Sequence, residues 1–127
     1  MTENVLDRIV FDRDGLVPVI TQSHASGEVL MLAWMSRDAL AETLASGRMC
    51  YFSRSRGRLW RKGETSGQVQ RLIELRLDCD GDALLALVDQ TGVACHTGRR
   101  SCFFTRLSER GAETVAEVLV PPERLYG

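Results

Sequence analysis

Residues 72–88 read LIELRLDCDGDALLALV, and this stretch decides the fold of the chain. Apolar and polar side chains alternate up to residue 80, a period that is typical of a β-strand with one covered face. One face of this expected strand carries Ile73, Leu75, Leu77 and Cys79, and the other carries Glu74, Arg76, Asp78 and Asp80. The apolar run over residues 83–88 predicts a second, buried strand, so the segment indicates a sheet.

Two apolar runs nearer the N-terminus, residues 16–20 and 28–35, flank a polar turn at residues 23–27. This pattern predicts a β-hairpin with a long loop. Pro18 is expected near a sheet edge, because proline has no N–H to donate to a ladder.

A helix of about ten residues is predicted next, from the N-cap Ser36, Asp38 in the first turn, Leu40 and Leu44 on one face, and Gly47 at the end. A strand over residues 48–52 follows it, and residues 108–118 suggest a second helix. The chain is therefore predicted to be α+β, with a mostly antiparallel β-sheet and one or two helices.

The size and charge of the chain limit the classes of protein to which it can belong. With 127 residues and 14.2 kDa, it is expected to fold as one domain over residues 1–127. A net charge of −1 gives no general attraction to nucleic acid or to an anionic membrane, so neither is an expected partner. Residues 1–8 lack the pattern of a signal peptide, and no apolar run reaches the roughly 18 residues that cross a bilayer. A cytoplasmic location is expected, where cysteines serve as thiols or metal ligands rather than disulfides.

Three of the cysteines, Cys79, Cys95 and Cys102, lie close together in the sequence. They lack the short spacing of a zinc ribbon, so the pattern by itself is a weak metal signal. The alternative is that they are small core residues, since free cysteine is among the most buried residue types. Cys50, in an apolar stretch, is predicted to be a core residue.

Asp78, Asp80 and Asp82 stand at alternate positions, where their carboxylates repel one another unless a cation or hydrogen bonds compensate them. Mg²⁺ accepts a few carboxylates together with water and substrate phosphate. A solvated acidic turn is the alternative interpretation. An EF-hand loop is excluded, because its sixth position requires glycine and is Ala83 here.

The strand period also bears on the number of metal sites. If the strand persists, Cys79 faces away from Asp78 and Asp80, so one ion cannot easily bind all three. Two sites are implied, a thiolate site suited to zinc and a carboxylate site suited to magnesium. A strand with a site on each face fits a subunit interface.

Residues 53–67 carry five cations and three glycines. Guanidinium groups, hydroxyls and exposed backbone N–H groups are the ingredients of a phosphate-binding loop. Arg54, Arg56 and Lys62 are the candidate substrate-binding residues, for a small phosphorylated ligand. A solubilising surface loop is one alternative, and an RNA site with Trp60 as a stacking platform is another.

Several blocks of the sequence, taken in order, resemble the phosphoribosyl-AMP cyclohydrolase family. The resemblance covers about residues 5–105, and its last three blocks together are highly specific. The blocks are DGLVP at residues 14–18, GEVLMLA at 27–33, SRSR at 53–56, LW at 59–60, KGETSG at 62–67, DCDGD at 78–82, ACHTG at 94–98 and SCFF at 101–104.

This resemblance implies hydrolytic opening of the adenine ring of phosphoribosyl-AMP at its N1–C6 bond, the third step of histidine biosynthesis. It also implies an intertwined homodimer with zinc and magnesium in each subunit. The zinc site is then shared between subunits, with Cys79 from one chain and Cys95 and Cys102 from the other. The magnesium ligands that the resemblance implies are Asp78, Asp80 and Asp82. The chain departs from the family pattern at Arg61, where many members have histidine.

The mechanism expected from this family uses a zinc-activated water and a nearby acid/base residue, as in zinc base deaminases. His96, next to Cys95, is the first candidate for the acid/base residue, and Glu64 is the second. The alternative is that His96 only holds the Cys95 turn. His24 is expected to be exposed and inert.

Two other protein classes compete with this interpretation. One is a non-enzymatic zinc module, in which three cysteines and a histidine close a structural site; its ligands would be Cys79, Cys95, Cys102 and His96. The other is a small RNA-binding protein that uses the basic stretch.

Overall fold

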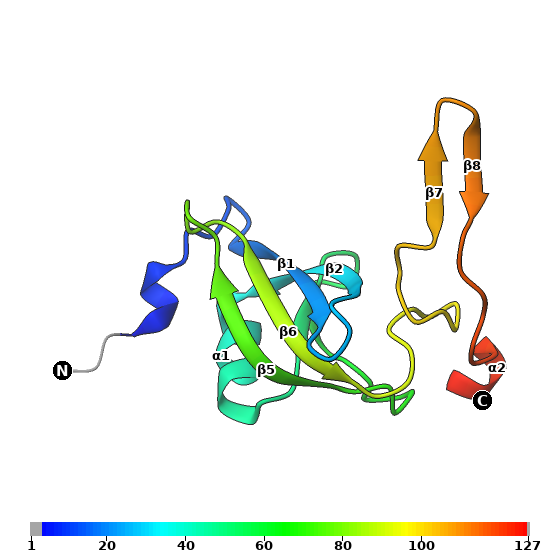
Figure 1. Cartoon of the computed structure of the whole chain (residues 1–127). Helices are drawn as coiled ribbons and strands as arrows, with labels where there is room; N and C mark the ends of the chain where they lie inside the picture. The colour runs from blue at the N-terminus through cyan, green and yellow to red at the C-terminus, as the bar shows by residue number, and fades with distance from the viewer. Residues whose placement is uncertain (1–3, 127) are drawn as a thin grey trace.

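The computed structural model describes residues 4–126, so residues 1–3 and 127 of the predicted single domain lie outside the description. Its main sheet has four strands in the order β2-β1-β6-β5 (Figure 1). The central strand β1 pairs antiparallel with β2 and parallel with β6, and β6 pairs antiparallel with β5. The strands are β1 (Leu16–Ser23), β2 (Val29–Ser36), β5 (Gln70–Leu77) and β6 (Leu84–Gln90). The sheet is mixed, with mostly antiparallel pairs, and the predicted α+β class is confirmed.

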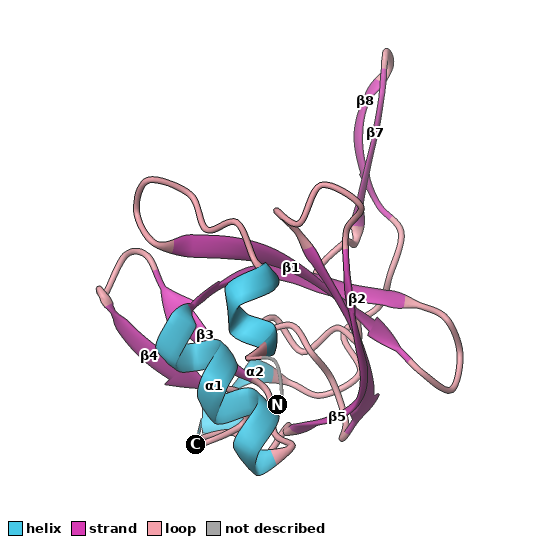
Figure 2. Ribbon diagram, turned by 90° about the vertical axis from the view of Figure 1, so that its left-hand side faces the viewer, coloured by secondary structure: helices cyan, strands magenta, loops and turns pink. Residues whose placement is uncertain are grey.

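The remaining elements surround this sheet or project from it. They are the 3₁₀ helix η1 (Val5–Arg8), the helices α1 (Arg37–Ser46) and α2 (Pro122–Tyr126), and two hairpins, β3 (Cys50–Ser53) with β4 (Arg58–Arg61) and β7 (Thr105–Ser108) with β8 (Gly111–Thr114). Figures 1 and 2 show the β7–β8 hairpin extending away from the rest of the chain. Among the described residues, every helix is too short or too polar to cross a membrane.

Helix α1 has the ends that its sequence predicts. The Ser36 hydroxyl accepts a hydrogen bond from the Ala39 N–H at 3.1 Å, and Gly47 ends the helix with a φ of 76°. That left-handed conformation is one glycine adopts readily. The predicted apolar face is only half right, because Leu40 is buried whereas Leu44 is 42% exposed.

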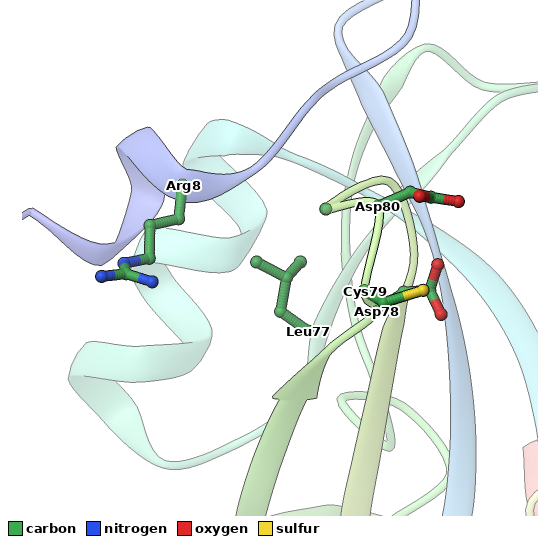
Figure 3. A pocket seen from close by; sticks show the side chains of 6 residues that line it. Arg8, Leu77, Asp78, Cys79 and Asp80 are labelled. Atoms are coloured by element: carbon green, nitrogen blue, oxygen red, sulfur yellow. The ribbon is translucent and has the colours of Figure 1, made fainter.

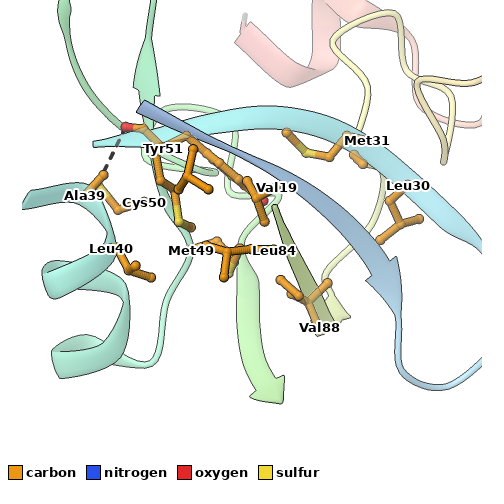
Figure 4. Packing of buried hydrophobic residues seen from close by; sticks show 14 residues of the cluster. Val19, Leu30, Met31, Ala39, Leu40, Met49, Cys50, Tyr51, Leu84 and Val88 are labelled. Atoms are coloured by element: carbon orange, nitrogen blue, oxygen red, sulfur yellow. Dashed lines mark hydrogen bonds between the residues drawn. The ribbon is translucent and has the colours of Figure 1, made fainter. Parts of the chain in front are cut away.

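The core lies between one face of the sheet, helix α1 and strand β3 (Figure 4). Alternate residues of β6 point into the core: Leu84, Ala86 and Val88. Tyr51 of β3 is fully buried, and its hydroxyl pairs with Thr21 at 2.8 Å and donates to the Gln70 side-chain oxygen at 2.6 Å. A buried polar chain thus ties β1, β3 and β5 together. Cys50 is a core residue, as predicted.

The opposite face of the sheet carries apolar side chains that the rest of residues 4–126 leaves partly exposed. Ile20 of β1 is 40% exposed and stands opposite Leu32 of β2, which is 48% exposed. Ile20 also stands beside Leu85 of β6, which is half-buried. An uncovered apolar sheet face is typical of an interface.

Three sequence-based expectations for the fold are corrected. Pro18 lies in a central strand and not at a sheet edge, but the pairing of β1 with β6 begins only at the next residue, Val19, so the missing N–H breaks no bond to β6. The two-residue period of β5 is interrupted by a bulge between Leu72 and Glu74, which leaves Ile73 38% exposed. Residues 108–118 form no helix; β7 and β8 occupy this region as a hairpin.

Candidate active site

The acidic segment after β5 is a tight turn. The strand ends at Leu77, and the turn is closed by hydrogen bonds from the Gly81 N–H to the Asp78 carbonyl at 2.9 Å and from the Asp78 N–H to the Ala83 carbonyl at 2.8 Å. Ligand atoms of Asp78, Cys79 and Asp80 all lie within 4.8 Å of one another, and all three residues are exposed. They line a small cavity of about 420 Å³, and Figure 3 shows the guanidinium group of Arg8 pointing away from them.

This turn corrects the argument that Cys79 faces away from the aspartates. Alternation holds only while the backbone is extended, and here it ends one residue before Asp78. The turn therefore gathers Asp78, Cys79 and Asp80 on one side. Asp82 is exposed on the same turn but lies outside this cluster.

Cys95 and Cys102 form a second cluster, on the loop that follows β6. The Cys95 N–H donates to the Arg99 carbonyl at 3.0 Å, which closes a short turn. The Cys102 N–H donates to the Leu30 carbonyl at 2.7 Å and so attaches this end of the loop to β2. The first bond therefore fixes the turn that carries Cys95, and the second fixes the position of Cys102 against the sheet.

The two sulfur atoms of this cluster are hydrogen-bonding neighbours. Cys102 is exposed as a residue, but its sulfur is enclosed enough that burial raises the pKa of its thiol to about 12. The Cys95 thiol adds to this rise, whereas the positive charge of Lys62 opposes it. Thr97 donates its hydroxyl hydrogen bond to the Cys95 sulfur at 3.0 Å. We call Cys95 and Cys102 the thiol pair.

Lys62 connects the thiol pair to the basic stretch. Its ammonium group donates to the Ala94 carbonyl at 2.5 Å and lies 5.3 Å from the centre of the Trp60 ring. Burial lowers the pKa of Lys62, and the nearby thiols of Cys102 and Cys95 act in the opposite direction. The residue predicted to bind phosphate thus also supports the loop that carries Cys95.

A cleft of about 1210 Å³ lies next to the thiol pair. Its wall contains the aromatic rings Trp34 and Trp60, cations, hydroxyl groups and His96; the charged and hydroxyl-bearing members are Ser53, Ser55, Arg56, Arg58, Arg61, Lys62, Glu64, Thr65 and Ser66. The cleft has the aromatic and polar lining that is typical of a small-molecule site. His96, the predicted acid/base residue, is exposed in this wall, as is its alternative Glu64.

Of the three predicted substrate-binding residues, Arg56 and Lys62 line the cleft, and Arg54 lies beside it. The Arg54 guanidinium group stacks over the Trp34 ring, 4.5 Å from its centre. Arg61, the departure from the family pattern, lines the cleft but is bound to Glu42 of α1 by two hydrogen bonds, at 2.7 and 2.9 Å. Neither Thr97 nor Trp34 was predicted to take part in the site; the position of Thr97, two residues after the candidate ligand Cys95, was the available signal.

Cys79 follows β5 in the turn before β6, whereas the thiol pair lies on the loop after β6, so the two groups lie at opposite ends of β6. Figure 1 shows the β5–β6 hairpin that separates them. Strand β6 spans seven residues, which corresponds to about 23 Å at the usual rise of a strand. Zinc–sulfur bonds are about 2.3 Å long. Among residues 4–126, the only set of three potential ligands within bonding reach of one ion is Asp78, Cys79 and Asp80. One chain therefore does not bring Cys79 to the thiol pair.

Comparison with known proteins gives a consistent result. Residues 31–104 match the model of the phosphoribosyl-AMP cyclohydrolase family. A protein of that name from Rhodospirillum rubrum is 69% identical over 118 residues, which are 92% of this chain and 82% of the relative. One from Granulibacter bethesdensis is 66% identical over 98% of both chains, and one from Rhodospirillum centenum is 62% identical over 100% of this chain and 98% of its own.

Proposed function

The chain belongs to the phosphoribosyl-AMP cyclohydrolase family and is an enzyme of histidine biosynthesis, and on this premise we propose the reaction in detail. It opens the adenine ring of phosphoribosyl-AMP by adding water across the N1–C6 bond. This is the third step of the pathway, and we propose that it takes place in the cytoplasm.

The observation that carries this proposal is that the thiol pair lies beside the cleft. Lys62 and His96 both line the cleft, and each adjoins a thiol: Lys62 through its charge, His96 through the peptide bond to Cys95. A purine held in the cleft would thus lie near soft metal ligands, a histidine and several cations.

The donor set of the thiol pair fits zinc. Two neighbouring sulfur atoms are soft ligands, and thiolate sites favour zinc over magnesium. We propose Cys95 and Cys102 as two zinc ligands and Cys79 of a second subunit as the third. Zinc held there with an open coordination position would supply a water molecule that is more acidic, and so a better nucleophile, than bulk water.

The protein groups of the cleft bind the substrate and move its protons. His96 accepts a proton from the attacking water and returns one to N1, which becomes an amidine nitrogen, still bonded to C2, when its bond to C6 breaks; Glu64 is the alternative residue for this role. Trp60, 38% exposed, offers a ring on which the purine can stack, an interaction worth about 1–3 kcal/mol per base. Arg54, Arg56 and Lys62 supply positive charge for a substrate phosphate.

The acidic turn fits a hard cation. Carboxylates, water and phosphate oxygens are the ligands that Mg²⁺ prefers, and the Asp78 and Asp80 carboxylates lie together. We propose these two residues and Asp82 as the magnesium ligands; an ion held there would supply positive charge for the second 5′-phosphate of the substrate. A shared dimer interface would bring this turn near the partner's cleft, because the same turn supplies Cys79.

A homodimer is supported by two further features. The uncovered face of the sheet carries Ile20 and Leu32, and Leu107 on the projecting β7–β8 hairpin is 77% exposed. Burying such surfaces against a second copy stabilises a dimer by about 25 cal/mol per Å² of apolar area. The closed structural-zinc alternative is disfavoured within one chain, because its ligand Cys79 is separated from the other three.

The direct test is turnover of phosphoribosyl-AMP by the purified protein, followed by absorbance of the ring-opened product. Activity should disappear on treatment with a zinc chelator and return when zinc is added. A folded, zinc-loaded protein without turnover would contradict the proposed reaction. Activity that survives complete removal of zinc would contradict the role of the metal.

A further inference from the structure

The Thr97 side chain makes a contact that the reaction described above does not use. Its hydroxyl group donates a hydrogen bond to the Cys95 sulfur, with 3.0 Å between oxygen and sulfur. Thr97 is half-buried, and Cys95 is buried. The bond therefore lies away from bulk water, where a donor to sulfur has more effect than at an exposed position.

On the other side of Cys95, Lys62 is held by the preceding residue. Its ammonium group donates to the Ala94 carbonyl, and it interacts electrostatically with the thiols of both Cys102 and Cys95. A hydroxyl donor and a fixed cation thus flank the thiol pair. Two adjacent metal-bound sulfur atoms carry concentrated negative charge, which such neighbours compensate.

We propose that Thr97 and Lys62 are positioning residues that hold the thiol pair in its metal-binding arrangement and reduce the negative charge on its sulfur atoms. This inference rests on the proposed zinc site but adds residues that are not ligands. Groups around metal ligands orient them and tune the metal, and changing one such group typically weakens metal binding about 10–100-fold. Thr97 acts mainly on Cys95, and Lys62 acts on both sulfur atoms.

The substitution Thr97→Val tests the hydroxyl group with little change of shape, and Thr97→Ser restores the hydroxyl. The matched control is Thr91→Val, which removes the same group from an exposed residue on the loop after β6. Each full-length protein is loaded with zinc, and the dissociation constant is measured by competition with a chelator. We expect Thr97→Val to weaken zinc binding about 10-fold or more, and Thr97→Ser and Thr91→Val to stay near the unmodified protein.

The spectrum of the cobalt-loaded proteins gives a readout that a merely structural role would not change. Loss of a hydrogen bond to sulfur makes it a stronger electron donor, so the sulfur-to-cobalt charge-transfer band should move to longer wavelength in Thr97→Val. Lys62→Met should shift the band in the same direction, whereas Lys62→Arg, which keeps the charge, should shift it less.

The outcomes separate this inference from the proposed function. Suppose that the unmodified protein binds zinc through sulfur and that Thr97→Val has the same zinc affinity and the same cobalt band. That result would overturn the positioning role alone. An unmodified protein without any sulfur-to-cobalt band would overturn the zinc site and this inference together. Weakened binding in Thr97→Val that Thr97→Ser fails to restore would indicate a packing effect and would also count against the hydrogen bond.

Discussion

Mixing two inactive variants should restore activity if the zinc site is shared between subunits. The variant Cys79→Ser keeps the thiol pair, and Cys102→Ser keeps Cys79. Within one chain these cysteines lie at opposite ends of β6, a strand of seven residues that spans about 23 Å. Sulfur ligands of one zinc ion must lie about 4 Å apart, given bonds of about 2.3 Å. If Cys79 and Cys102 bind the same zinc ion, as proposed, each intact site combines Cys79 of one chain with Cys102 of another.

The expected recovery follows from this geometry. When the two variants are unfolded together and refolded in equal amounts with zinc, random pairing makes about half of the dimers mixed. In a mixed dimer, one site has all its cysteines and the other lacks two. About a quarter of all sites should then be intact, so turnover of phosphoribosyl-AMP and zinc content in the site should reach about a quarter of the unmodified values.

A control mixture shows whether recovery comes from sharing of ligands between subunits or from mixing of any two variants. Cys95→Ser refolded with Cys102→Ser should give no recovery, because every site in the mixed dimer then lacks one sulfur of its thiol pair. The reasoning would be refuted if the Cys79→Ser and Cys102→Ser mixture formed dimers by size-exclusion chromatography but stayed as inactive as its parents. Recovery in the control mixture would refute it equally.

Three other predictions test the fold that supports the site. Tyr51→Phe should lower the free energy of unfolding by about 1–3 kcal/mol, because it leaves a buried glutamine oxygen without its donor; an unchanged midpoint in urea would contradict this. Burial raises the pKa of the Cys50 thiol from its ordinary value of 9.0 to about 12. The neutral thiol should therefore contribute fully to the free energy of unfolding below pH 9.0, and this contribution should decline as pH rises from 9.0 to about 12. In Cys50→Ala, this part of the pH dependence of stability, measured by denaturation, should be lost. Gly98→Ala should lower Tm more than Gly57→Ala, because an added Cβ would lie 1.8 Å from the Val120 carbonyl oxygen in the first case and in open space in the second, although both glycines have positive φ; equal losses would show that the close approach does not matter.

Local features of the fold could be predicted from the sequence because they depend on neighbouring residues. Helix α1 begins at Ser36 and ends at Gly47 as expected, since an N-cap acts on the N–H groups of the next turn and glycine adopts the terminal conformation without strain. The burial of Cys50 was also predictable from its apolar surroundings.

The errors arose where pairing between strands decides the local conformation. The bulge that exposes Ile73 depends on how β5 pairs with β6, and the hairpin at residues 105–114 depends on pairing between two short, exposed strands. Neither pairing leaves a clear period in the sequence. The predicted orientation of Cys79 was wrong for the same reason, because β5 ends at Leu77, where its pairing with β6 ends.

The sequence by itself determined the family, the candidate ligands and the cations, because these follow from residue types in a specific order. The tertiary structure alone decided which of them meet. It gathers Asp78, Cys79 and Asp80 on one turn, and it brings Cys95 to Cys102. It also holds these two groups apart by the length of a rigid strand. Side-chain chemistry belongs to each residue alone, whereas proximity depends on where each strand ends, how the next loop folds and which strands pair.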